Sequence, residues 1–318
     1  MTDAKGIPGF EERFAQTKAS RLRYLVGGQA DGEPVVLVHG LGGCAANWVD
    51  MAPLLAETRR VLVPELPGHG LSTPLPAVPN LGVFADRIAL VAEREQALPA
   101  AFVGHSLGAV VGLRLALGRP GDVNALVLAA AAGISSTSRR ARYGLRILGI
   151  IGPRRLVAPW ADSVAGSPFL RYAVFGHWGA ADPLIMSPEA VDGFLEGTRL
   201  TSDSVSAARA VVIDDVRPEL GELRCPTLVL WGARDNQLPL VDGFEFARRL
   251  DAPLRVIADC GHLLIGERPG VCAEAIENFL AEASLATPTS RPWRLCRRGR
   301  LNPREKAVPP STTGGTVG

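Results

Sequence analysis

The chain has 318 residues, of which 47% are hydrophobic and 21% are charged, and its formal net charge is +2. This length and composition suit one large domain with an insertion and a sizeable buried core. Residues 291–318 carry seven basic residues and one acidic residue, which leaves a net charge of −4 on the rest and gives no indication of nucleic-acid binding.

The first half of the chain alternates between predicted strands and helices. Residues 1–19 are expected to form a polar leader that can hold a short helix, and a strand over 21–26 begins the sheet. The later strands are apolar on both faces, as in strands buried between two layers of helices, so we expect a mostly parallel sheet with right-handed crossovers. These elements are strands over 35–38, 60–64, 101–105 and 124–130 and helices over 47–57, 82–97 and 107–117.

The alternation then stops, and residues 134–217 favour helix and contain several large aromatic side chains. The strand pattern resumes at Thr227, so this segment is expected to be an insertion into a core formed by residues 20–133 and 218–286. The tail over 287–318 is rich in proline, arginine, threonine and glycine and lacks the apolar periodicity of a packed element. We therefore expect the tail to be disordered.

Five scattered cysteines show no CxxC pair and no spacing typical of a metal site, so neither zinc nor a disulfide framework is expected. The first residues lack the apolar region of a secretory signal. No stretch reaches the roughly 18 consecutive apolar residues that span a membrane. These features favour a cytoplasmic location with reduced thiols.

Four motifs at the ends of predicted strands carry residues suited to catalysis. The sequence Gly-His-Ser-Leu-Gly over 104–108 joins a strand to a helix, and Gly-x-Ser-x-Gly in this position is typical of a nucleophile elbow. Its glycines are expected because a Cβ would clash with the crowded turn. The other motifs are His-Gly-Leu-Gly-Gly over 39–43, Trp-Gly-Ala-Arg-Asp over 231–235 and Cys-Gly-His over 260–262.

In these motifs the chain resembles the α/β-hydrolase family over roughly residues 20–285, and the order serine, aspartate, histidine is the order of that family. The resemblance implies that Ser106 is the nucleophile, His262 the base and Asp235 the acid that orients the histidine. It therefore predicts an α/β-hydrolase fold with a mostly parallel central sheet flanked by helices.

The resemblance also implies two further parts of the site. The backbone N–H groups of Leu41 and Leu107 are expected to form the oxyanion hole. The insertion over 134–217 is expected to be a helical lid, placed between strands six and seven above the active site. Six arginines between residues 139 and 155 leave open a contact of this lid with a membrane surface.

Other residues compete for the acid and base roles. Asp214 and Asp215 lie near an earlier acid position, whereas Asp259 is too close to His262 along the chain to orient its ring easily. Of the remaining histidines, three inside glycine-rich motifs are expected to have structural roles, and one in the insertion is a candidate substrate contact. They are His39, His69, His105 and, in the insertion, His177.

The resemblance implies a serine hydrolase that cleaves carboxylic esters of lipophilic or aryl substrates through an acyl-enzyme on Ser106, without a cofactor or a metal. Its expected partner is a small-molecule ester, and the oligomeric state is not predicted. Three alternatives stay open: a C–C hydrolase of the meta-cleavage-product type, a cofactor-free perhydrolase or haloperoxidase-like enzyme, and a non-catalytic small-molecule sensor. C–C hydrolases commonly carry tryptophan where this chain has Leu263.

Overall fold

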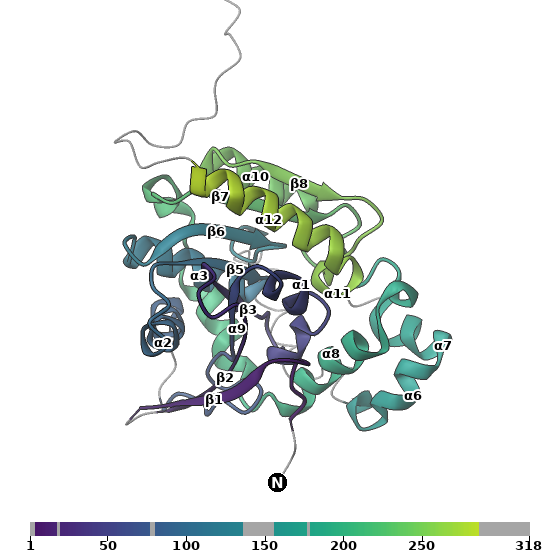
Figure 1. The fold of residues 1–318 in the computed structure, drawn as a ribbon. Coiled ribbons are helices and arrows are strands. Elements are labelled where there is room, and N and C mark those ends of the chain that lie inside the picture. The colour runs from purple at the N-terminus through teal and green to yellow at the C-terminus, as the bar shows by residue number, and fades with distance from the viewer. Residues whose placement is uncertain (1–3, 18–19, 77–79, 136–155, 177–178, 286–318) are drawn as a thin grey trace, which may run out of the picture. The chain divides into compact units, whose positions relative to one another are not determined.

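The computed structural model describes residues 4–17, 20–76, 80–135, 156–176 and 179–285, and within them an eight-stranded sheet organises the fold (Figure 1). Its strands are β1 (Glu11–Gln16), β2 (Arg21–Gly28), β3 (Pro34–Val38), β4 (Arg60–Pro64), β5 (Ala100–His105), β6 (Val123–Ala129), β7 (Thr227–Gly232) and β8 (Leu254–Ile257). Their order across the sheet is β1-β2-β4-β3-β5-β6-β7-β8. The β1–β2 and β2–β4 pairs are antiparallel, and the other five pairs of neighbouring strands are parallel. The predicted mostly parallel sheet is confirmed.

Helices cover both faces of the sheet. Successive side chains of a strand point to opposite sides, so the apolar side chains of the inner strands are buried on both faces. In β3, Val35 and Leu37 pack in the same hydrophobic cluster as α1 and α12, whereas Val36 and Val38 pack with α2, α3 and α10. These helices are α1 (Ala52–Ala56), α2 (Leu81–Arg94), α3 (Leu107–Gly118), α10 (Leu240–Leu250) and α12 (Pro269–Leu285), and α11 (Leu264–Glu267) directly precedes the last of them.

The described residues between β6 and β7 are helical over most of their length. Two of the helices, α8 and α9, extend the two hydrophobic clusters of the core, α8 on the side of α12 and α9 on the side of α3. The elements of this segment are η3 (Ala158–Trp160), α6 (Ala161–Gly166), α7 (Pro168–Arg171), the π-helical turn η4 (Tyr172–Gly176), η5 (Pro183–Ile185), α8 (Pro188–Leu200), α9 (Ser204–Ile213) and η6 (Arg217–Glu222).

Three sequence-based expectations fall on residues outside the described part of the chain. These are the candidate substrate contact His177, the six arginines between residues 139 and 155 and the predicted disordered tail over 287–318. Among the helices that the structure does describe, none combines the length and the apolar character needed to cross a membrane.

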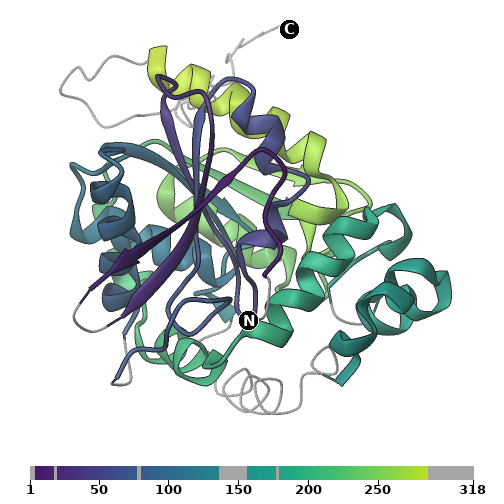
Figure 2. The ribbon, with the colours of Figure 1, turned by 60° about the horizontal axis from the view of Figure 1, so that its bottom comes forward.

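The N-terminal region differs from the sequence prediction. Residues 11–16 form the edge strand β1, paired antiparallel with β2, where a polar leader with a short helix was expected (Figure 2). An edge strand of this kind keeps one side in solvent and so lacks the apolar run by which the inner strands were recognised. The predicted helix over 47–57 is also divided, into a 3-10 turn η1 (Ala45–Trp48) and α1, because Pro53 favours the start of a new helix.

Candidate active site

Ser106 occupies the sharp turn between β5 and α3. Its backbone has φ 53° and ψ −110°, a conformation that residues with a Cβ rarely adopt. The turn is fixed by hydrogen bonds from the Ser106 N–H to the Ala129 carbonyl, at 2.9 Å, and from the Ala132 N–H to the Ser106 carbonyl, at 3.2 Å. The chain therefore has the strained strand–turn–helix geometry that its Gly-x-Ser-x-Gly motif predicts.

The two glycines of the motif allow the backbone to pack without side chains. A Cβ on Gly104 would come closer than 3.0 Å to the Gly108 carbonyl oxygen and to the backbone of Ala109. A Cβ on Gly108 would come equally close to the carbonyl oxygens of Val38 and His39, at the end of β3. The second glycine thus brings the start of α3 against the loop that follows β3.

Asp235 and His262 are bonded to each other at the sheet edge where this turn lies. They follow β7 and β8, and the carboxyl ends of these parallel strands lie at the same edge of the sheet as the end of β5. His262 Nδ1 lies 2.8 Å from Asp235 Oδ2, and both side chains are buried. Asp235 Oδ1 accepts hydrogen bonds from the N–H groups of Gln237, at 2.8 Å, and Leu238, at 2.9 Å. These bonds hold the Asp235 carboxylate in place. The carboxylate favours the tautomer of His262 with a proton on Nδ1, so that Nε2 can accept a proton.

A second contact joins the loop of His262 to the elbow. His105, the residue before Ser106, bonds through Nε2 to the carbonyl oxygen of His262 at 2.8 Å, and the two rings lie 5.0 Å apart. The N–H of His262 donates to the carbonyl of Gly179 at 2.5 Å. The hydrogen bond of His105 therefore joins the Ser106 turn to the His262 backbone, which is a structural role of the kind expected for this residue.

The two backbone N–H groups predicted to bind an oxyanion belong to segments next to Ser106. Leu107 is the first residue of α3, where amides have no partner within the helix and the helix dipole favours negative charge. Leu41 lies in the loop after β3, and a Cβ on the preceding Gly40 would lie 3.2 Å from the Ser106 Cβ. Within the described part of the chain, neither amide has a hydrogen-bond partner. The oxyanion role of these two N–H groups stays a prediction.

Residues 35–275, well over half of the chain, match the sequence profile of the Alpha/beta hydrolase family. The chain belongs to the α/β-hydrolase family.

Relatives of this α/β hydrolase carry several activities in their names. The chain is 31% identical over 267 residues to the pimeloyl-[acyl-carrier protein] methyl ester esterase of Aromatoleum aromaticum, covering 77% of this chain and 97% of that protein. It is 29% identical over 286 residues to the 2-hydroxymuconate semialdehyde hydrolase of a Pseudomonas species (strain CF600), covering 84% and 94%. The solved structure of a hydrolase from Pseudomonas aeruginosa PA01 superimposes with a TM-score of 0.70 at 25% identity, covering 85% and 98%.

Some of the similar proteins are longer than this chain, as one example shows. The chain is 29% identical over 257 residues to the dihydrolipoyllysine-residue acetyltransferase component of the acetoin cleaving system of Pseudomonas putida. This match covers 79% of the chain but spans only 64% of the length of that protein. The similarity therefore concerns part of the larger protein.

The three rival carboxylates of this α/β hydrolase each pair with an arginine. None of them has a hydrogen bond to His262 within the described residues, and only Asp235 does. The pairs are Asp214 with Arg114, Asp215 with Arg217 and Asp259 with Arg234.

Two other histidines, His39 and His69, are buried near the site. His39 Nε2 accepts a hydrogen bond from the Leu66 N–H at 3.1 Å, so its Nδ1 donates to the Gly40 carbonyl at 2.8 Å. Burial lowers the pKa of His39 to about 3 and the pKa of His69 to about 4. Both rings are therefore neutral and structural, as expected from the sequence. His177 lies outside the described residues.

Glu267 is a residue of the site to which the sequence assigned no role. Its buried carboxylate accepts hydrogen bonds from the N–H groups of Gly261, at 3.0 Å, Ala181, at 2.7 Å, and Asp182, at 3.3 Å. Burial raises the pKa of Glu267, and these backbone bonds oppose the rise. The carboxylate thus joins the His262 loop to the segment before α8. Only the three-dimensional contact shows this, because Ala181 and Glu267 are 86 residues apart in the sequence.

Among the described residues, no group of three or more histidine, cysteine, aspartate or glutamate side chains is arranged to hold a metal ion.

Proposed function

We propose that this α/β hydrolase cleaves carboxylic esters through an acyl-enzyme on Ser106. The observation that carries the proposal is the 2.8 Å bond between Asp235 and His262. The pair follows two strands that end at the same sheet edge as the strand before Ser106, which is held at φ 53° in a strand-to-helix turn. A serine hydroxyl attacks a carbonyl only when a base removes its proton, and a histidine oriented by a buried carboxylate is suited to that task.

In the first half of the reaction, Ser106 attacks the ester carbonyl while His262 Nε2 takes the hydroxyl proton. Asp235 holds the Nδ1 proton and stabilises the imidazolium that forms. The N–H groups of Leu41 and Leu107 bind the oxyanion of the tetrahedral intermediate, and each such donor typically contributes about 3 kcal/mol. His262 then protonates the departing alkoxide. In the second half, water attacks the acyl-enzyme by the same route.

The segment between β6 and β7 is proposed to act as a lid over this site. Its support comes from the backbone of Gly179, whose carbonyl accepts hydrogen bonds from the N–H groups of His262 and Leu263. On the helices of this segment, the aromatic side chains of Trp160 and Phe169 are 61% and 78% exposed. On the proposed lid, these exposed aromatic rings favour lipophilic or aryl esters as substrates.

A C–C hydrolase is the second candidate function. The similarity to the 2-hydroxymuconate semialdehyde hydrolase, over 94% of its length, favours it. Leu263 opposes it, because this buried residue follows the base where C–C hydrolases commonly carry tryptophan. Faster turnover of a vinylogous diketo acid than of p-nitrophenyl esters would favour this reaction over ester hydrolysis.

The proposal is tested with the variants Ser106→Ala and His262→Ala on a series of p-nitrophenyl esters of increasing acyl length. Each single variant is expected to lose all measurable turnover while keeping the unfolding midpoint of the wild type. The double variant is expected to be no slower than either single variant, because the two groups act as one unit. Additive losses, or substantial turnover by Ser106→Ala, would contradict the assigned roles.

A further inference from the structure

We infer that Glu65, a residue with no contact to the nucleophile or base in the mechanism above, is a positioning residue for the oxyanion hole. The inference rests on the proposed function, because it concerns the loop that carries the Leu41 N–H. That loop, residues 39–45, is here called the Leu41 loop. Glu65 follows β4, and its side chain is fully buried.

The Leu41 loop is bound at both of its ends to two consecutive residues, Glu65 and Leu66. At its start, His39 Nε2 accepts a hydrogen bond from the Leu66 N–H at 3.1 Å. At its end, the Ala45 N–H donates to Glu65 Oε1 at 3.2 Å. The chain between these two anchors is short, so the position of Leu41 follows the position of Glu65 and Leu66.

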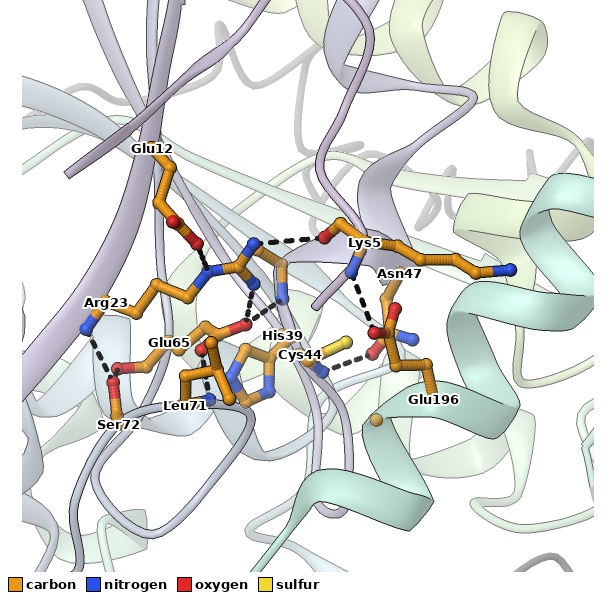
Figure 3. A network of polar contacts seen from close by, with 12 residues as sticks. Lys5, Glu12, Arg23, His39, Cys44, Asn47, Glu65, Leu71, Ser72 and Glu196 are labelled. Carbon is orange, nitrogen blue, oxygen red and sulfur yellow. Dashed lines mark hydrogen bonds and ion pairs between the residues drawn. The ribbon is translucent and has the colours of Figure 1, made fainter. Parts of the chain in front are cut away.

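The carboxylate of Glu65 is itself held from several directions. Arg23 Nη1 donates to Oε1 at 2.8 Å, and the Leu71 N–H donates to Oε2 at 2.7 Å. In Figure 3 the guanidinium of Arg23, which is 1% exposed, lies between Glu12 and Glu65. A Cβ on Gly70 would come closer than 3.0 Å to this carboxylate, so the glycine leaves room for it. Glu65 is therefore a rigid point from which the loop is held.

Helix α8 closes the opposite side of the Leu41 loop. A Cβ on Gly197 would lie 2.8 Å from the Gly43 Cα, and a Cβ on Gly193 would come closer than 3.0 Å to the Ala46 carbonyl oxygen. Asn47 Nδ2 also donates to the Gly193 carbonyl at 3.1 Å. The loop thus lies between the glycine face of α8 and the Glu65 carboxylate, and each side limits how far it can move.

The N-terminal segment connects these two sides. The Lys5 N–H donates to Glu196 Oε1 on α8 at 2.8 Å, and the Lys5 carbonyl accepts from Arg23 Nη2 at 3.1 Å (Figure 3). Arg23 in turn bonds Glu65, so the contacts form a continuous path from α8 to the carboxylate. We expect this arrangement to preorganise the Leu41 N–H for the oxyanion. A preorganised donor stabilises the transition state more than a donor that must reorient during the reaction.

The test compares Glu65→Gln with Glu12→Gln. Glutamine keeps the size of the side chain but removes the charge that faces Arg23 and one of the acceptor oxygens. Glu12→Gln is the matched control, because it changes the same arginine network and leaves the bonds to the Leu41 loop in place. The measurements are kcat and KM for a short p-nitrophenyl ester and the affinity for a trifluoromethyl ketone, which forms a tetrahedral adduct.

For Glu65→Gln, kcat is expected to fall about 10-fold or more, since loss of a whole oxyanion donor costs about 100-fold or more. KM is expected to stay within about twofold, because the loop acts on the transition state. Affinity for the ketone is expected to fall by the same factor as kcat. Glu12→Gln is expected to leave kcat and the ketone affinity unchanged.

A purely structural role would lower the unfolding midpoint without this parallel loss. Wild-type kcat in folded Glu65→Gln, or a loss of kcat with full ketone affinity, would overturn the inference.

A second variant approaches the loop from the other side and decides the matter if Glu65→Gln does not fold. Gly197→Ala pushes against Gly43, whereas Gly118→Ala, whose Cβ meets nothing within 4 Å, is its control. Gly197→Ala is expected to show the same parallel loss of kcat and ketone affinity, and wild-type values would overturn the inference. If the wild type neither hydrolyses the ester nor binds the ketone, the proposed function itself fails, and the inference falls with it.

Discussion

At the scale of single residues, the side chains at the strand ends divide into those that carry the proposed chemistry and those that hold it in place. In the proposed mechanism Asp235 and His262 activate Ser106, whereas His105 and Glu267 bond the backbone around His262. The second group is buried and bonded to main chain, so its members fix geometry without meeting substrate in the proposed mechanism. Substitutions in the two groups are therefore expected to have different kinetic effects.

Asp235→Asn tests the pair directly. An amide can present its NH₂ group to Nδ1 and so favour the wrong tautomer, and kcat on an ester is expected to fall about 10²- to 10⁴-fold. Some turnover is expected to remain, because Ser106, His262 and the oxyanion donors are unchanged. If Asp235→Asn kept a kcat near that of the wild type, the acid role would pass to Asp214 or Asp215.

At the scale of elements, the sequence predicted the parts of the fold that are buried on both faces. The inner strands and the elbow follow from apolar runs and from the spacing of two glycines. Edge strand β1 was missed, because a strand with one side in solvent has no such run.

The site's supporting contacts were missed for another reason. Glu65, Glu267 and Gly179 act through main-chain groups far away in the sequence, and a single sequence gives no signal for such contacts.

A prediction at this scale concerns the packing of α3 against β3. Gly108→Ala is expected to lower the free energy of unfolding by at least about 2 kcal/mol, because its Cβ would overlap the Val38 carbonyl oxygen. Gly118→Ala, at the other end of α3, is expected to change it by less than about 1 kcal/mol. Urea unfolding of both variants measures the difference. Equal stability of the two would show that the elbow can relax to admit a side chain.

At the scale of the whole molecule, buried histidines link stability to pH. Burial lowers the pKa of His39 to about 3 and the pKa of His69 to about 4, whereas both have ordinary values of about 6.5 in the unfolded chain. Between pH 6.5 and about 4 the unfolded state therefore binds more protons than the folded state. It follows that stability rises with pH across this window and is lost as the pH falls through it.

The free energy of unfolding is accordingly expected to decrease between pH 7 and pH 5, by up to about 1.4 kcal/mol per pH unit for each histidine at the lower end. Urea titrations at several pH values measure this slope. A free energy that stays constant between pH 7 and pH 5 would show that these two rings are protonated as readily in the folded protein as in the unfolded chain.

The central claim is that Ser106 is the nucleophile, and the site of covalent labelling by a fluorophosphonate tests it most directly. This reagent phosphonylates a serine that is activated by a neighbouring base, and peptide mapping by mass spectrometry locates the adduct. We predict one adduct, on the peptide that contains Ser106, with full loss of ester hydrolysis, and no adduct in Ser106→Ala. An adduct on another residue, or hydrolysis that continues after Ser106 is fully labelled, would contradict the account.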